Sequence, residues 1–347
     1  MSFTLRDETR SLLDGDLLTS DEAAWAMGEL LGGSADVASA AAFLAALQAV
    51  GEGADALEGF LSEYLRHTSP LPCGGEALDI VGTGGDHSGT VNISSMAAIV
   101  IAAAGVPVLK HGHRAVHSRS GSADFFAALG VDLDATPEQV AQIFTEIGIG
   151  FASAPLYHHD TEWVESLLRR LRIPAVFDVL SPLSNPAEPR AMAVGVARED
   201  RLSPVAEVLA RRSVSGLVFR GMDGLDELST TGPNTILQVS GGEVFETELD
   251  PASLGLAPAE LEDLVGGDAE SNAEIARSVF DGEAGSVRDI VLLNAAGGLV
   301  AARLSTDPDS ALEPLRERFE EALGTAVEAL DSGAAADLLA TWVEAFE

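Results

Sequence analysis

Short apolar runs alternate with helical patterns over most of the chain, and this alternation constrains the fold more than any other feature. Residues 78–82 (LDIVG) and 106–112 (VPVLKHG) predict buried strands, and the segments that follow each of them predict helices. The same order returns at 191–197 (AMAVGVA) and 216–220 (GLVFR). Such alternation is typical of a parallel sheet covered by helices. The sequence therefore predicts a large α/β domain with a central sheet flanked by helices.

The N-terminal segment has no strand pattern and predicts only helices. Thr19 and Glu22 have the spacing of a capping box, and Ser34 is the expected cap of the next helix, which ends near Gly51. Amphipathic helices of this kind usually form a small bundle or the face of an oligomer.

The 347 residues are enough for two domains. The pattern changes near residue 72, so we expect a small all-helical domain over 1–72 and an α/β domain over 73–347. The stretch from about 162 to 189 looks helical and loop-like, and we expect it to add helices to the small domain.

Charge excludes several classes of partner. The chain has 20 Lys and Arg against 55 Asp and Glu, a net charge of −35, and the acids are spread along its whole length. Such a surface repels nucleic acids and anionic membranes. Lys110 is the only lysine, and the other basic residues are arginines. We interpret this balance as adaptation to a high-salt cytoplasm, as in halophiles. An ordinary acidic protein is the alternative.

The location predicted from the sequence is cytoplasmic. No run approaches the roughly 18 apolar residues that span a bilayer, and the first twenty residues carry acids where a signal peptide carries bases. The single cysteine, Cys73, excludes an internal disulfide and a multi-cysteine zinc site.

A glycine-rich segment, Gly82-Thr83-Gly84-Gly85-Asp86, directly follows the first predicted strand. Glycines let a ligand approach the backbone closely and expose N–H groups, which suits a phosphate. The segment lacks the Gly-Lys-Ser/Thr of a P-loop. A dinucleotide fingerprint counted from Gly82 would need glycine at position 87, where the chain has histidine. A purely structural turn between strand and helix is the alternative.

Polar and basic residues cluster around the next elements of the chain. Asn92, Ser94 and Ser95 open the helix after the glycine-rich segment. Lys110 lies near the end of the second predicted strand, and Arg114 follows that strand. A lysine charge, an arginine and several hydroxyls together suit a pyrophosphate. The alternative is that the one lysine is there by chance.

Two kinds of metal site are compatible with the sequence. Asp226 and Glu227 lie in a loop after a predicted strand, and carboxylates combined with substrate phosphates are the usual magnesium arrangement. In so acidic a chain, such a pair also arises by chance. His111, His113 and His117 have a spacing that could hold zinc. The simpler interpretation is that the histidines form hydrogen bonds near a polar cleft.

Taken together, these motifs resemble the anthranilate phosphoribosyltransferase family, which is related to pyrimidine nucleoside phosphorylases. DIVGTGGD, TVNIS, KHG-x-R, SGSAD, SPLSNP and GLDELSTTGP occur in fitting order and spacing, and the likeness extends to VLLNAAGGLV near the C-terminus. The resemblance implies a small helical domain beside an α/β domain, usually dimerising through the helices. It also implies transfer of 5-phosphoribose from 5-phosphoribosyl 1-pyrophosphate (PRPP), with magnesium, to an aromatic amine, most simply anthranilate.

The resemblance also implies roles for individual residues. Lys110 and Arg114 would be catalytic by neutralising the departing pyrophosphate, and Ser94, Asp226 and Glu227 would hold magnesium. The residues implied to bind PRPP are Gly82, Gly85, Asp86, Thr90, Asn92, Ser94, Ser95, Lys110, Arg114, Ser118 and Ser122. Those implied to bind the acceptor are Gly82, His111, His113, His158, Leu168, Arg172 and Pro182.

The acceptor half departs from the family pattern. His113 stands in place of an asparagine, Asp178 stands in place of another, and Leu168 occupies the position of the arginine that pairs with the anthranilate carboxylate. Losing that cation would leave a buried anion unpaired. Arg172, one helical turn from Leu168, could replace it. Otherwise the chain is a paralogue with a different aromatic or nitrogenous acceptor. A nucleoside phosphorylase, a zinc hydrolase and a non-catalytic relative are the rival interpretations.

Overall fold

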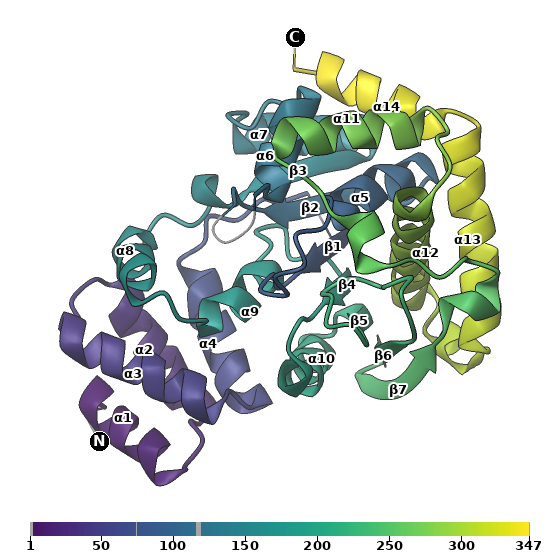
Figure 1. The fold of residues 1–347 in the computed structure, drawn as a ribbon. Helices are drawn as coiled ribbons and strands as arrows, with labels where there is room; N and C mark the ends of the chain where they lie inside the picture. Colours follow the sequence, from purple (N-terminus) through teal and green to yellow (C-terminus); the bar gives the residue numbers. More distant parts are fainter. Residues whose placement is uncertain (1–2, 74, 116–118, 347) are drawn as a thin grey trace.

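A seven-stranded sheet forms the centre of the molecule, with strand order β3-β2-β1-β4-β5-β6-β7 (Figure 1). The computed structural model describes residues 3–73, 75–115 and 119–346. The first five strands are parallel, and the last two pair antiparallel at one edge. The strands are β1 (Leu78–Gly82), β2 (Val108–Gly112), β3 (Ile149–Ser153), β4 (Ala191–Gly195), β5 (Ser215–Gly221), β6 (Asn234–Ser240) and β7 (Glu243–Leu249). The predicted α/β domain with a central sheet is confirmed.

Helices cover both faces of this sheet, because alternate strand residues point to opposite sides. Leu78 and Ile80 of β1 pack under α5 and α12, whereas Val81 and Met192 belong to the core on the α10 side. The helices of the α/β part are α5 (Ile93–Ala103), α6 (Ser122–Leu129), α7 (Pro137–Ile147), α10 (Leu202–Arg211), α11 (Ala269–Phe280), α12 (Ser286–Thr306), α13 (Leu315–Asp331) and α14 (Ala334–Glu344).

The N-terminal helices form a separate bundle at one end of the molecule (Figure 1). They are α1 (Leu5–Asp14), α2 (Ser20–Leu31), α3 (Val37–Val50) and α4 (Ala54–Arg66). The capping box at Thr19 and Glu22 is confirmed. The expectation for Ser34 is wrong: Asp36 caps α3, and its carboxylate accepts from the Ser39 N–H at 2.9 Å. An N-cap side chain must lie three residues before the amide that it caps, and Ser34 lies too early.

Two later helices, α8 (Glu162–Leu171) and α9 (Val176–Leu183), join the apolar core of the bundle. Val164 and Leu180 are fully buried in the same cluster as Phe60 of α4. That cluster continues onto the sheet through β4, so apolar packing runs without a break from the bundle to the sheet. A division of the chain at residues 72 and 73 stays a prediction.

The strand order fixes where a ligand can bind. From β1 the chain crosses toward β2 and β3, and from the neighbouring β4 it crosses toward β5. The loops after β1 and β4 therefore diverge, and in open α/β sheets such a switch point leaves a crevice at the carboxyl ends of the strands. We expect the functional site at this crevice.

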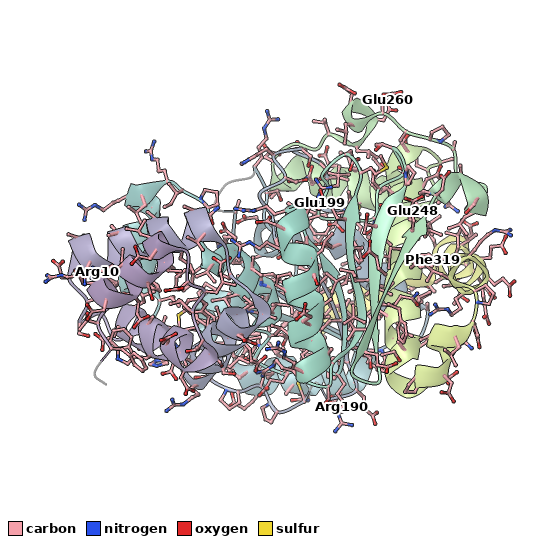
Figure 2. The ribbon with its side chains drawn as sticks, turned by 90° about the horizontal axis from the view of Figure 1, so that it is seen from below. Arg10, Arg190, Glu199, Glu248, Glu260 and Phe319 are labelled. Carbon is pink, nitrogen blue, oxygen red and sulfur yellow. The ribbon has the colours of Figure 1, made fainter. Side chains whose placement is uncertain are left out.

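Carboxylates and guanidinium groups populate the outer surface in Figure 2, where Arg10, Arg190 and Glu260 lie at the edge of the view. Phe319, labelled in the same view, is fully buried. Many arginines on this surface are paired with acids, as in the bidentate contact between Arg198 and Asp200. Within the described residues no helix is both long and apolar enough to cross a membrane.

The net charge of −35 predicts that stability depends on salt. The 55 acids outnumber the 20 basic residues, and only at about molar ionic strength does the screening length fall to roughly 3 Å. We therefore expect the thermal unfolding midpoint to fall progressively when potassium chloride is lowered from about 2 M to about 0.1 M. Differential scanning fluorimetry across that range would measure it. A midpoint that does not change with salt would contradict the halophilic interpretation.

Candidate active site

Asp226 and Glu227, the acidic pair, lie at the carboxyl ends of β1 and β4, the two strands that flank the switch point. Gly82 of β1 and Gly195 of β4 face each other in register. A Cβ atom at Gly82 would overlap the Asp226 carboxylate, and one at Gly195 would overlap the Asp226 backbone. The Gly84 N–H donates to Asp226 Oδ2 at 2.7 Å. The two glycines therefore allow the acidic loop to approach the strand ends, where a side chain would prevent it.

Ser94, Asp226 and Glu227 come together at this crevice, as the sequence implied. The Ser94 N–H, in the first turn of α5, donates to Glu227 Oε1 at 3.2 Å. Glu227 Oε2 is buried and has no hydrogen-bond partner among the described residues. Burial raises the pKa of Asp226 to about 7, and burial with repulsion from Asp226 raises that of Glu227 to about 8. A bound cation would offset the cost of burying the two carboxylates and the repulsion between them.

This donor set fits magnesium. Two carboxylates and a hydroxyl leave most of the coordination sphere to water and substrate phosphates, which is how magnesium is usually bound. Within the described residues, no three His, Cys, Asp or Glu side chains are grouped in a way that could hold a metal. For the zinc alternative, His111 bonds the Ser181 carbonyl and His113 the Arg114 carbonyl. His117 lies outside the described residues.

Lys110 approaches the same crevice from β2. Its side chain is buried, and its ammonium donates to the backbone carbonyl of Ile80 and lies 3.4 Å from Ser94 Oγ. Burial lowers the pKa of Lys110, and the nearby acids Asp79 and Glu227 oppose that shift. The only lysine of the chain therefore lies within reach of the implied metal site, where its charge can act on a phosphate in a low dielectric.

The glycine-rich loop bends back on itself between β1 and α5. Gly84, Gly85 and His87 all have positive φ, at 67°, 83° and 58°, a region that glycine enters without strain. Ser88 Oγ donates to Asp86 Oδ2 at 2.5 Å. Thr90 forms an isolated antiparallel bridge with Val265, which closes the loop from the far side. The loop surrounds the helix N-terminus where a phosphate is expected.

Asn92 links three segments around this loop. Its side-chain oxygen accepts from Ser120 Oγ at 2.9 Å and from Asn272 Nδ2 at 2.8 Å. Its amide nitrogen donates to the Ser120 carbonyl at 3.3 Å. Ser95, on the same helix, is fully buried. Asn92 thus holds the loop walls together in addition to any contact with PRPP.

Arg114 and Ser122 lie at the outer rim of the crevice. Arg114 forms a 2.9 Å ion pair with Asp124, whose other oxygen accepts from the N–H groups of Ala115 and Gly121. Ser122 is the first residue of α6, and its hydroxyl lies so close to Gly112 that a Cβ atom on Gly112 would overlap it. Ser118 lies outside the described residues. The implied PRPP residues therefore form an inner group around Lys110 and an outer group around Arg114.

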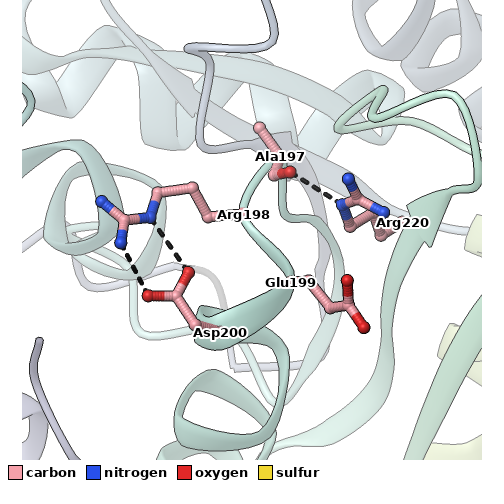
Figure 3. Close-up of a pocket in the computed structure, with 5 residues that line it drawn as sticks. All are labelled: Ala197, Arg198, Glu199, Asp200 and Arg220. Carbon is pink, nitrogen blue, oxygen red and sulfur yellow. Dashed lines mark hydrogen bonds and ion pairs between the residues drawn. The ribbon is translucent and has the colours of Figure 1, made fainter.

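A shallow hollow of about 620 Å³ lies next to this loop at the ends of β4 and β5 (Figure 3). The Ala197 N–H donates to Thr83 Oγ1 at 3.1 Å, which joins the hollow to the glycine-rich segment. Arg198 binds Asp200 through two hydrogen bonds, and Arg220 donates to the Ala197 carbonyl at 2.8 Å. These contacts hold the loop after β4 beside the loop after β1.

On the acceptor side, two buried histidines meet. His158 Nε2 lies 3.1 Å from His111 Nε2, and His111 Nδ1 lies 3.2 Å from the carbonyl of Ser181, the residue before Pro182. The Tyr64 ring stacks near His158, with 4.9 Å between ring centres. His111, His158 and Pro182 are thus brought together, with Tyr64 as an aromatic neighbour that the sequence did not indicate.

Hydrogen bonds surround both rings of this pair. The Ser181 carbonyl can only accept, so His111 Nδ1 carries the proton of that ring. Thr68 Oγ1 lies 2.9 Å from His158 Nδ1 and donates to the Tyr64 carbonyl at 3.0 Å. Burial keeps both rings neutral: it lowers the pKa of His111 well below its usual value and that of His158 to about 4. The pair therefore presents two neutral rings and no cation.

The expectation that Arg172 lies on the same helical face as Leu168 is wrong. Helix α8 ends at Leu171, and Arg172 is its left-handed cap, with φ 53° and its N–H bonded to the Leu168 carbonyl. A four-residue spacing places side chains on one face only while the helix continues. Arg172 is exposed, whereas Leu168 packs against the bundle core.

The other two departures from the family pattern are on the surface or in a helix cap. His113 is exposed and its ring nitrogen lies 2.7 Å from the Arg114 carbonyl. Asp178 accepts from the Ala175 N–H at 3.0 Å and so caps α9. That hydrogen bond gives the added carboxylate a partner at the start of the helix.

Sequence reasoning missed a buried acid that organises both halves of the site. Asp79 in β1 accepts from the His111 N–H at 3.2 Å and from Asn185 Nδ2 at 2.8 Å. Asn185 also donates to the Leu109 carbonyl. Burial raises the pKa of Asp79 to about 7. An acid inside an apolar strand was the signal that could have found it.

Comparison with known proteins shows to which family the chain belongs. A glycosyl transferase family α/β domain matches residues 74–336, and the helical bundle domain of that family matches residues 6–68. An anthranilate phosphoribosyltransferase of Leifsonia xyli is 50% identical over 335 residues, which cover 96% of each chain. The fold and crevice thus define a glycosyl transferase with an N-terminal helical bundle.

Solved structures give the same result. The anthranilate phosphoribosyltransferase of Thermus thermophilus matches with a TM-score of 0.87 and 38% identity, covering 98% of this chain and 99% of that one. The Saccharomyces cerevisiae enzyme in complex with PRPP and Mg matches with a TM-score of 0.85 and 27% identity, covering 98% and 97%. The chain belongs to the anthranilate phosphoribosyltransferase family, which confirms the resemblance seen in the sequence.

Proposed function

We propose that this protein transfers 5-phosphoribose from PRPP to anthranilate and releases pyrophosphate. The observation that carries the proposal is the convergence of Asp226 and Glu227 with the only lysine, Lys110, at the switch point of the sheet. A relative that is 50% identical over nearly the whole chain carries the name of this activity, and one structural neighbour was solved with PRPP and Mg.

The residues suggest how the reaction proceeds. Ser94, Asp226 and Glu227 would hold magnesium, which supplies positive charge to the pyrophosphate. Lys110 adds a second cation from the buried side, and the amides of the glycine-rich loop orient the phosphates. The amine nitrogen forms a bond to ribose C1 while the C1–oxygen bond breaks, and the electron pair leaves with pyrophosphate. The nitrogen then gives up one proton.

The acceptor would lie between the histidine pair and α9. His111, His158 and Tyr64 offer neutral rings to an aromatic amine. A second candidate is a family member whose acceptor lacks a carboxylate. Leu168 is uncharged and Arg172 is exposed, so neither residue places a cation where the bundle faces these rings. Anthranilate takes precedence because the relatives are named for it.

One assay separates these candidates. The protein would be incubated with PRPP and magnesium in molar potassium chloride, with anthranilate, with aniline or without acceptor. Loss of anthranilate fluorescence matched one to one by pyrophosphate would support the proposal. Pyrophosphate release with aniline but not with anthranilate would favour the second candidate. No PRPP consumption with any acceptor would contradict both.

We also propose that the protein forms a homodimer through the helical bundle and acts in the cytoplasm, since both substrates are charged and do not cross membranes unaided. Leu13 and Leu17, 71% and 59% exposed, are apolar side chains on the bundle surface. Replacing both by glutamate is expected to halve the molar mass in light scattering, because it puts charges into an apolar contact. Leu312→Glu, at an exposed leucine of the α/β domain, is the matched control. An unchanged mass in the double variant would argue against this surface.

A further inference from the structure

Two buried asparagines bind the main chain immediately after the acidic pair. Asn294 of α12 accepts from the Leu228 N–H at 2.9 Å and donates to the Leu228 carbonyl at 2.8 Å. Asn234, the first residue of β6, accepts from the Ser229 N–H at 2.7 Å and donates to the Ser229 carbonyl at 2.9 Å. Each amide group thus pairs with both polar groups of one residue, as a neighbouring strand would.

These asparagine contacts take the place of the backbone hydrogen bonds that a strand would make with its neighbour. Residues 226–230 belong to no helix or strand, yet Leu228 and Ser229 are fully buried. Without the two asparagines, two N–H and two C=O groups would be buried without partners, which proteins avoid. Both asparagine side chains are themselves fully buried.

Helix α12 also holds the side chain of the same residue. A Cβ at Gly297, three residues after Asn294 and therefore on the same helical face, would come within 2.6 Å of Leu228 Cδ1. The Leu228 side chain thus packs directly against the helix at Gly297. Backbone and side chain of this residue are both fixed by one face of α12.

The acidic pair needs such support. Glu227 is buried and Asp226 directly before it is half-buried, and adjacent carboxylates repel each other. Asp226 is held at the strand ends by the Gly84 amide, and Glu227 by the Ser94 amide. On the other side of the pair, the next two residues are held by Asn294 and Asn234. Two backbone amides therefore hold the carboxylates of the pair, and two asparagines hold the main chain that follows it.

From this geometry we infer that Asn294 and Asn234 are positioning residues, which hold the Asp226–Glu227 pair in the arrangement that binds the magnesium ion of Mg–PRPP. The inference rests on the proposed function and adds residues that do not themselves touch the ligand. Asn294 lies in VLLNAAGGLV, a segment 66 residues from Leu228 in the chain.

The test measures magnesium-dependent PRPP binding directly. PRPP would be titrated calorimetrically into wild type and into Asn294→Ala, at several fixed magnesium concentrations and without magnesium. Losing support around a metal ligand typically weakens metal affinity roughly 10- to 100-fold. We expect the magnesium concentration for half-maximal enhancement of PRPP binding to rise by about tenfold or more, with PRPP binding in the absence of magnesium unchanged.

Controls separate positioning from general destabilisation. Leu304→Ala lies on the same helix, is fully buried and does not bond the loop, so it lowers the unfolding midpoint without changing the magnesium dependence. If Asn294→Ala does not fold, Asn294→Asp keeps the acceptor for the Leu228 N–H, loses the donor and should show a smaller shift in the same direction. Asn294→Ala with wild-type magnesium dependence, or an equal shift in Leu304→Ala, would overturn the inference. Wild type without any magnesium effect would instead contradict the proposed function.

Discussion

Replacing Asp226 and Glu227 together by alanine is expected to lower kcat/KM for PRPP by about a thousandfold or more. Without the metal, the transition state loses several kcal/mol of stabilisation of the leaving pyrophosphate. Each factor of ten in rate corresponds to about 1.4 kcal/mol. Pyrophosphate release and anthranilate fluorescence, followed together at saturating anthranilate, would measure the loss.

The fold should survive this change. The pKa of each acid is raised in the folded protein, so ionisation of the pair opposes folding as the pH rises above ordinary carboxyl values. The double variant should thus unfold at the same or a higher temperature at pH 8. The exposed acids Asp281 and Glu283, replaced by alanine together, give the same charge change and should leave the rate within about twofold. A double variant at Asp226 and Glu227 with a wild-type rate would remove these residues from the site.

Replacing Lys110 by methionine is expected to lower kcat/KM for PRPP by about a hundredfold to a thousandfold. Methionine is close to lysine in length but carries no charge, so the buried strand should fold while the departing pyrophosphate loses one cation. Arginine should not restore activity, because its planar guanidinium does not fit a site shaped for a compact ammonium.

The matched control for Lys110 is Arg190→Met, which removes a positive charge from an exposed side chain just before β4. Arg190 lies at the amino end of that strand, whereas the crevice lies at the carboxyl ends. Initial rates at low and at saturating PRPP would show whether binding or turnover is lost. Equal rates for Lys110→Met and wild type would contradict the assignment of this lysine.

Much of the fold could be predicted because its signals are local. Strands β1 and β2 show as short apolar runs that end in glycine, and the glycine-rich segment follows the first of them. Once the sheet is parallel, the carboxyl ends of its strands lie at the same end of the sheet, so the loops after β1 and β5 open on the same side of the molecule. The antiparallel strands β6 and β7 were not predicted, although the Gly-Gly pair at 241–242 is a hairpin signal.

The parts that could not be predicted depend on contacts between distant segments. Asn294 lies far from Leu228 in sequence, and no periodicity indicates that its amide pairs with that backbone. The end of α8 is a similar case, because Arg172 looks helical by spacing but takes a left-handed conformation. Sequence spacing therefore gave the wrong position for Arg172 and left the acceptor half less well defined than the PRPP half.

The most direct test of the central claim is PRPP binding at the switch-point crevice. Calorimetric titration of PRPP would be performed with and without magnesium, on wild type and on Asp226→Asn/Glu227→Gln, which keeps the shape of both side chains. The account predicts magnesium-enhanced binding in wild type and loss of that enhancement in the variant. Equal enhancement by magnesium in both proteins would contradict it.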